Sequence, residues 1–295
     1  MNNESRNPFV GWAWKIPAIA IAYFIGVMIS GGVITAAKMP WPAFPQSVSQ
    51  ANEFIIGLIG SILMAICLAL LARGIRGSQT VRWLILAIFS YVTFGLNNQI
   101  EAAIFTTYGG TATMLVFFIL PCAFGAAAAV YLFRPEHPEE SLESVVSKQP
   151  LSRWWWRAGV AWIAFPVIYV FFGMLAAPVV VPVYQSQDFG LTLPGFGTMI
   201  PVALVRSALY LAVTIPILVN WSRSRRSLFL SLGIALFAMM GLIGLLSATF
   251  FPPVLRVAHS VEILGDAIVY AWLLVALFIP KVRHEINEPV AAIAE

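Results

Sequence analysis

The sequence Arg256-Val-Ala-His-Ser-Val-Glu-Ile-Leu-Gly-Asp-Ala-Ile-Val-Tyr270 opens the last apolar segment of the chain. Its ionisable residues recur at intervals of three and four, and this spacing places side chains on one face of an α-helix. The residues on this face are Arg256, His259, Glu262, Asp266 and Tyr270. Most of the intervening residues are apolar, so the stretch predicts a helix with one polar face and one apolar face.

The composition excludes an ordinary soluble domain. Of the 295 residues, 60% are hydrophobic and only 10% are charged, whereas soluble domains carry about 25% charged residues. Several apolar runs approach the ~20 residues that a helix needs to cross a bilayer. The sequence therefore predicts an all-α polytopic membrane protein in contact with the lipid bilayer. The pI of about 9.2 is assigned to basic cytoplasmic loops and not to a nucleic-acid partner.

Eight apolar runs along the chain predict eight transmembrane helices. They cover residues 16–36, 54–71, 83–105, 112–133, 158–181, 200–220, 228–250 and 257–279. The first run has the alternative interpretation of a secretory signal peptide. It is longer than the roughly 7–15 residues of a signal core, so we expect an uncleaved span. The only long polar stretch, residues 135–153, predicts a cytoplasmic linker.

The basic residues are distributed unevenly between the two sides of this topology. If the N-terminus is cytoplasmic, all but three of the 17 Lys and Arg residues fall on the cytoplasmic side, with Arg82 in the short loop after the second span. The three exceptions are Lys38, Arg206 and Arg256. Under the positive-inside rule, this distribution predicts a cell-membrane protein with both termini in the cytoplasm.

The two halves of the chain share a weak internal repeat. A shift of 146 residues places the third span on the seventh. The matched pairs are Gly95 with Gly241, Leu96 with Leu242, Ala102 with Ala248, and Phe105 with Phe251. Chance matching of apolar residues is the alternative, but each half also has a long first outer loop and a short second outer turn. We therefore expect one four-helix repeat in residues 1–134, the linker in 135–153, and a second, parallel repeat in 154–295.

Most polar residues inside the predicted spans occur in one half only, which indicates a single asymmetric site. An ionisable side chain at the bilayer centre costs about 2.5–3.5 kcal/mol by insertion scales, so it usually faces the protein interior and pairs. The third, sixth and eighth spans bring such groups to a similar depth, and we expect a polar pocket there that is open to the outer side. Glu101 is expected to pair with Arg206 or Arg256. The candidate residues are Asn97, Asn98, Glu101, Arg206, Tyr210, Arg256, His259, Glu262 and Asp266.

These side chains are compatible with three functions. The first is binding or translocation of a small or lipid-like ligand with a polar or anionic head, which Arg206 and Arg256 would hold. The carboxylates would then balance charge or relay protons. The second is a membrane-embedded enzyme acting on a lipid or isoprenoid, with Glu101 or Glu262 and His259 in acid–base roles. The third is a structural or sensor protein with a buried ion network.

Metal and cysteine chemistry are not expected in this site. His259, Glu262 and Glu101 would form a plausible ligand set for zinc or iron, but the two arginines oppose a bound cation. Cys122 lies much deeper in its span than His259, which excludes a cysteine peptidase built on these two residues. The sequence identifies neither a cofactor nor an oligomeric state.

Overall fold

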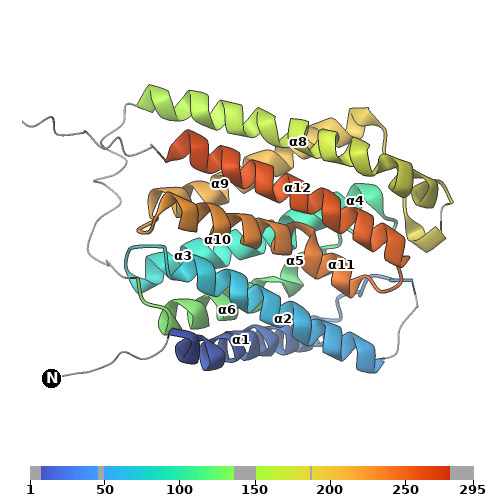
Figure 1. Cartoon of the computed structure of the whole chain (residues 1–295). Coiled ribbons are helices and arrows are strands. Elements are labelled where there is room, and N and C mark those ends of the chain that lie inside the picture. The colour runs from blue at the N-terminus through green and yellow to red at the C-terminus, as the bar shows by residue number, and fades with distance from the viewer. Residues whose placement is uncertain (1–7, 46–49, 136–150, 187, 280–295) are drawn as a thin grey trace, which may run out of the picture.

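The computed structural model describes residues 8–45, 50–135, 151–186 and 188–279. Within these residues the regular structure is helical, without a strand, and the helices run back and forth side by side (Figure 1). Eight of the helical spans are long and apolar enough to cross a membrane. The predicted all-α class and the number of spans are therefore confirmed for the described part of the chain.

The spans of the first half begin with α1 and α2 and end with two interrupted helices. Their elements are α1 (Pro8–Ala36), α2 (Gln50–Ala72), α3 (Gln79–Ser90), η1 (Tyr91–Leu96), α4 (Asn97–Phe105), α5 (Ala112–Phe117) and α6 (Ile119–Leu132). The third span is the continuous run from α3 to α4, and η1 is its π-helical middle. The fourth span is formed by α5 and α6.

The second half has the same number of spans. Its elements are α8 (Leu151–Gln185), η2 (Asp188–Gly190), α9 (Phe196–Val219), α10 (Arg225–Phe237), η3 (Ala238–Leu242), α11 (Ile243–Ser247) and α12 (Pro253–Phe278). Here η3 is a π-helical segment between α10 and α11, and η2 is a short 3₁₀ turn before α9. In Figure 1, α1 and α8 lie on opposite edges of the bundle.

The bundle has two ends, which the chain visits in alternation. α1 begins and α12 ends at one of them, the terminal end, and the loops 74–78 and 221–224 lie there as well (Figure 1). Residues 37–45, 106–111, 188–195 and 248–252 lie at the opposite end, the far end. Most of the predicted linker 135–153 and the tail after residue 279 fall outside the described residues.

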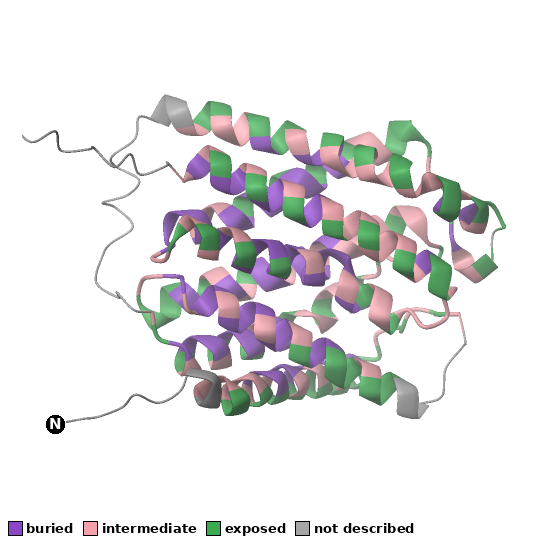
Figure 2. Cartoon of the chain, in the orientation of Figure 1, coloured by how far each residue is buried: buried purple, intermediate pink, exposed green. Residues whose placement is uncertain are grey.

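Apolar side chains cover the outside of the bundle as well as its core. Figure 2 shows buried positions along the facing sides of the helices and exposed positions along their outer sides. Large exposed side chains such as Val167, Leu175 and Val261 belong to helices α8 and α12. A soluble protein rarely exposes so much contiguous apolar surface, and in a bilayer this surface faces lipid. The fold is that of a multi-pass membrane protein.

Several helix ends in the two halves lie the same 146 residues apart. The Ser78 hydroxyl caps α3 by accepting from the Val81 N–H at 3.3 Å, and Ser224 caps α10 by accepting from the Ser227 N–H at 3.2 Å. Such caps satisfy N–H groups that the first helical turn leaves unpaired. The π-helical segments η1 and η3 follow at matching positions, and α6 and α12 end at matching residues.

The two terminal-end loops pair through their backbones. Ile75 and Trp221 form an isolated antiparallel bridge, and they too are 146 residues apart. The Ser222 N–H donates to the Gly74 carbonyl at 2.8 Å. A Cβ atom on Gly74 would overlap the Trp221 ring, so a glycine is needed at this close approach. The link joins the first half of the chain to the second.

The structure corrects the placement of Arg82 in a cytoplasmic loop. Arg82 belongs to the first turn of α3, and its side chain is buried. Its guanidinium donates to the carbonyl oxygens of Ala72 at 2.7 Å, Ile75 at 3.0 Å and Phe133 at 2.6 Å. These carbonyls follow or end α2 and α6, where helical hydrogen bonding runs out. Arg82 therefore closes two helix C-termini at once.

Candidate functional site

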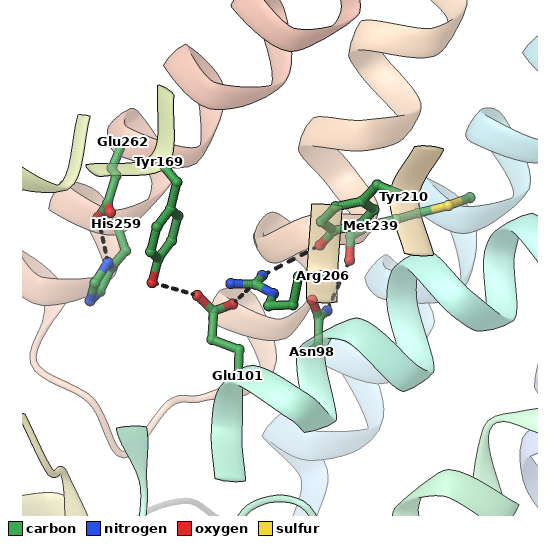
Figure 3. Close-up of polar contacts among 8 residues, drawn as sticks. All are labelled: Asn98, Glu101, Tyr169, Arg206, Tyr210, Met239, His259 and Glu262. Carbon is green, nitrogen blue, oxygen red and sulfur yellow. Dashed lines mark hydrogen bonds and ion pairs between the residues drawn. The ribbon is translucent and has the colours of Figure 1, made fainter. Parts of the chain in front are cut away.

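An ion pair joins α4 to α9 near the far end. Arg206 Nη2 lies 2.7 Å from Glu101 Oε2, and the two residues come from helices in different halves of the chain (Figure 3). The Arg206 side chain is 3% exposed, whereas that of Glu101 is 29% exposed. The carboxylate therefore covers the guanidinium, and this is one of the two pairings that the sequence predicts for Glu101.

Two tyrosines complete the surroundings of this pair. The Tyr169 hydroxyl of α8 donates to Glu101 Oε1 at 3.1 Å, so each carboxylate oxygen has a different donor. Arg206 Nη2 also contacts the Tyr210 hydroxyl at 3.4 Å. The Arg206 guanidinium carbon lies 5.5 Å from the Tyr169 ring centroid and 5.9 Å from that of Tyr210, within the range of cation–π attraction.

A second polar pair lies beside this cluster, on α12. His259 Nδ1 is 2.7 Å from Glu262 Oε2, and the Tyr184 hydroxyl of α8 is 3.4 Å from His259 Nε2. In Figure 3, Tyr169 lies between the His259–Glu262 pair and Glu101. The carboxylate orients the imidazole, so that its other nitrogen faces Tyr184.

Asp266 lies one turn further along α12 and is buried. Its Oδ1 atom has no hydrogen-bond partner among the described residues. Asp266 interacts electrostatically with Glu262, Glu101 and Arg206. The carboxylate thus belongs to the same electrostatic cluster, and its Oδ1 atom is unpaired within the part of the chain that the structure describes.

Asn97 and Asn98 begin α4, one turn before Glu101. The Asn98 amide donates to the Met239 carbonyl in η3 at 2.9 Å (Figure 3). Asn97 is buried, and within the described residues neither polar atom of its side-chain amide has a partner. Asn98 therefore connects the two π-helical spans, and its amide nitrogen is already occupied.

Arg256 does not join the cluster, although the sequence analysis placed it there. It lines a groove beside Phe237, Leu246 and Leu264, on another side of α12. The reason is the helical repeat: at about 100° per residue, ten residues bring Arg256 about 80° away from Asp266 around the helix. Arg206 is therefore the cation that balances Glu101.

Several side chains that were expected to line an open pocket bond to one another, and the pocket itself stays a prediction. Two surface grooves formed by described residues lie elsewhere, one along Gln79, Trp83 and Tyr131 and the other beside Arg256. In the same part of the chain, no three His, Cys, Asp or Glu side chains are close enough to hold a metal ion. The cluster's chemistry is therefore that of one guanidinium, three carboxylates, one imidazole and tyrosine hydroxyls.

Comparisons with known proteins give no relative from which a function could be inferred, so the function has to be argued from the chemistry of the cluster. No family model, curated protein or solved structure matches the chain. The sequence predicted Glu101, Arg206, Tyr210, His259, Glu262 and Asp266, and these residues form or adjoin the cluster. Tyr169 and Tyr184 were missed, because Tyr169 has no ionisable residue one helical turn away, as Tyr210 has in Arg206, and Tyr184 lies beyond the predicted end of its span at residue 181.

Proposed function

We propose that this multi-pass membrane protein binds or translocates a small or lipid-like ligand with a polar or anionic head at the Glu101–Arg206 cluster. The supporting observation is the way in which Glu101 is held. Its carboxylate accepts from Arg206 and from Tyr169, one donor to each oxygen. Guanidinium and hydroxyl donors arranged in this manner form an anion site. Glu101 occupies that site and is the more exposed partner.

In this proposal the anionic head of the ligand replaces the Glu101 carboxylate as the partner of the Arg206 guanidinium. A buried guanidinium without a counter-charge is strongly unfavourable, so Glu101 can leave only if another anion replaces it. A free Glu101 carboxylate beside Asp266 and Glu262 would in turn repel them, and a proton removes that repulsion. Binding of one anionic head is therefore coupled to the uptake of about one proton.

The same proposal includes the topology and the internal repeat. We place both termini in the cytoplasm and the far end of the bundle on the outer side of the cell membrane. The reason is that all but three of the 17 Lys and Arg residues fall towards the terminal end. The matching serine caps, π-helical segments and helix ends support two parallel four-helix repeats within residues 1–134 and 154–295. The antiparallel bridge between Ile75 and Trp221 suits a two-fold relation about the membrane normal.

The test uses a panel of single-chain amphiphiles with equal tails and different heads. Purified protein in neutral detergent is heated with an alkyl carboxylate, phosphate or sulfonate, and with the matching alcohol. We expect at least one anionic head to raise the melting temperature more than the alcohol does, with proton uptake in unbuffered solution. If every anionic head acts like the alcohol, the proposal is wrong.

Two variants separate ligand binding from folding in this test. Glu101→Gln should still bind the anionic amphiphile but without proton uptake, because the titrating competitor is gone. The charge-balanced double variant Glu101→Gln with Arg206→Gln should fold and lose the preference for the anionic head. Retention of that preference in the double variant contradicts a role of Arg206 in binding.

A second candidate function is supported by the His259–Glu262 pair. The Glu262 carboxylate on Nδ1 fixes the imidazole, and Nε2, which faces the Tyr184 hydroxyl, would act as the general base. The protein would in this case act on a lipid or isoprenoid in the outer leaflet. Incubation with phospholipid vesicles and mass spectrometry of the products tests this function. The activity must disappear in His259→Asn, and its absence from the wild-type protein argues for binding alone.

A further inference from the structure

A groove runs along the outside of α12 near the far end. Its volume is about 320 Å³, and α12 forms one wall, while the other comes from Phe237 at the end of α10 and from Leu246 of α11. Val257, Val261 and Leu264 line the α12 side and are all exposed. An apolar groove on the outer surface of a transmembrane helix faces the hydrocarbon of the bilayer.

Arg256 is the one charged side chain in this groove. Among the residues that the structure describes, no carboxylate pairs with it, and its buried Nε atom has no hydrogen-bond partner. An unpaired guanidinium at the edge of a membrane is stabilised when it meets an anion. The groove therefore combines an apolar wall with an unsatisfied cation.

The position of Arg256 along α12 sets the depth of this charge. α12 begins at Pro253, so Arg256 is in its first turn, at the far end of the bundle. The apolar groove residues Val257, Val261 and Leu264 follow it towards the middle of the membrane. At about 1.5 Å per residue, Leu264 lies roughly 12 Å deeper than Arg256. The charge is thus at the headgroup level and the groove below it at the level of the acyl chains.

We propose that this groove binds a phospholipid of the leaflet on the far side, with its phosphate on Arg256 and an acyl chain along Val257, Val261 and Leu264. The guanidinium offers several N–H donors, which match phosphate oxygens. The first turn of α12 adds the positive end of the helix dipole. A peptide or protein partner could contact the apolar wall. It would not match the arrangement of the groove, in which the charge lies at the membrane surface and the apolar residues lie deeper in the membrane.

This site is independent of the Glu101–Arg206 cluster and of the function proposed for it. Arg256 lies on a different side of α12 from Asp266, and no groove residue takes part in the cluster's hydrogen bonds. The lipid is a bound component of the protein surface here and not its transported or reacting ligand. Loss of lipid binding therefore leaves the proposed exchange at Glu101 untouched.

The experiment measures lipid binding to the full-length protein by native mass spectrometry. Protein delipidated in mild detergent is titrated with dioleoyl phosphatidylglycerol, with dioleoyl glycerol, which has the same chains without a phosphate, and with glycerol phosphate, which has the head without chains. We expect only the phospholipid to give a stable adduct. Equal binding of dioleoyl glycerol contradicts the role of Arg256, and equal binding of glycerol phosphate contradicts the role of the groove.

Substitutions test the two parts of the site separately. Arg256→Gln should weaken phosphatidylglycerol binding about fivefold, since one basic residue at an anionic membrane surface contributes roughly that factor. Lys38→Gln is the matched control, because Lys38 is an exposed basic residue at the same end of the bundle. Val261→Trp fills the groove at a lipid-facing position that is 64% exposed, so it should fold and lose the adduct even where Arg256→Gln fails to fold. Unchanged binding in Val261→Trp, or equal losses in Arg256→Gln and Lys38→Gln, overturns the proposal.

Discussion

Arg206 and Glu101 are 105 residues apart in the chain and form an ion pair of 2.7 Å between α9 and α4. The guanidinium is almost fully buried, while the carboxylate stays partly open to the surroundings. This asymmetry means that the two partners are not equivalent in energy. Removal of the carboxylate leaves a buried charge, and in the proposed function an incoming anion replaces the carboxylate from its more exposed side.

The first prediction is that Glu101→Gln destabilises the protein by about 3–5 kcal/mol, the cost of breaking a buried ion pair from one side. Thermal unfolding in detergent at neutral pH measures the change. Combining it with Arg206→Gln should restore part of the loss, because the uncompensated charge is then removed. Glu53→Gln, at an exposed glutamate of α2, is the control. A similar small effect of both glutamate variants would show that the pair is only a surface contact.

The second prediction concerns Tyr169, whose hydroxyl donates to Glu101. Tyr169→Phe keeps the ring and removes this hydrogen bond, so it should cost about 1.5–3 kcal/mol, as expected for a hydrogen bond to a charged group. A double-mutant cycle with Glu101→Gln should show positive coupling between the two positions. Tyr131→Phe, at an exposed tyrosine of α6, should have no measurable effect. Additive effects of Tyr169→Phe and Glu101→Gln would contradict the bond.

The third prediction is that Asp266→Asn does not lower the stability of the protein, whereas Glu101→Gln does. The Asp266 carboxylate is buried, and its Oδ1 atom has no partner among the described residues. An amide of the same shape removes the cost of burying a carboxylate without a partner. We expect unchanged or higher stability together with smaller proton uptake on binding of the anionic amphiphile, because one of the two carboxylates that would repel a displaced Glu101 is gone. A large loss of stability would mean that the carboxylate has a partner that stabilises its charge.

The eight spans were predictable because a bilayer imposes a strong and simple requirement. Every span must be a helix of about 20 apolar residues, and length and composition are visible in the sequence. The prediction that Glu101 pairs with Arg206 or Arg256 followed from the same cost, since few cations lie at its depth, and the structure shows the pair with Arg206. The π-helical segments η1 and η3 were not predicted, because such segments depend on packing against neighbouring helices and have no sequence pattern of their own.

Two predicted positions, those of Arg256 and Arg82, were wrong. Each step in the stretch from Arg256 to Tyr270 is helical, but the first two steps of three residues add up to a rotation of about 120° between Arg256 and Glu262, which carries Arg256 away from the cluster. Arg82 was assigned to a loop because basic residues usually mark loops. It was not recognisable as buried, since its partners are three backbone carbonyls that no side-chain pattern indicates.

The fourth prediction is that Arg82 is among the most sensitive residues outside the candidate site. Arg82→Gln removes charged donors from three carbonyl oxygens at helix ends, and each unsatisfied buried group costs about 1–3 kcal/mol. We expect a loss of more than about 3 kcal/mol in thermal unfolding. Arg82→Lys should recover only part of it, because a single ammonium cannot reach three carbonyls in the same geometry. Arg134→Gln, at an exposed arginine after α6, should be neutral.

The last prediction tests the topology on which the outer position of the cluster depends. Cys67 and Cys122 are buried, so cysteines introduced at exposed loop positions will react first with a membrane-impermeant maleimide. Thr107 lies in the far-end turn after α4, and Gln79 lies at the terminal-end start of α3. The distribution of basic residues predicts that the terminal end is cytoplasmic. Under that prediction, Thr107→Cys should be labelled in intact cells and Gln79→Cys only after permeabilisation. The reverse labelling pattern would show that the orientation in the membrane is inverted. The ligand would then reach the Glu101–Arg206 cluster from the cytoplasm.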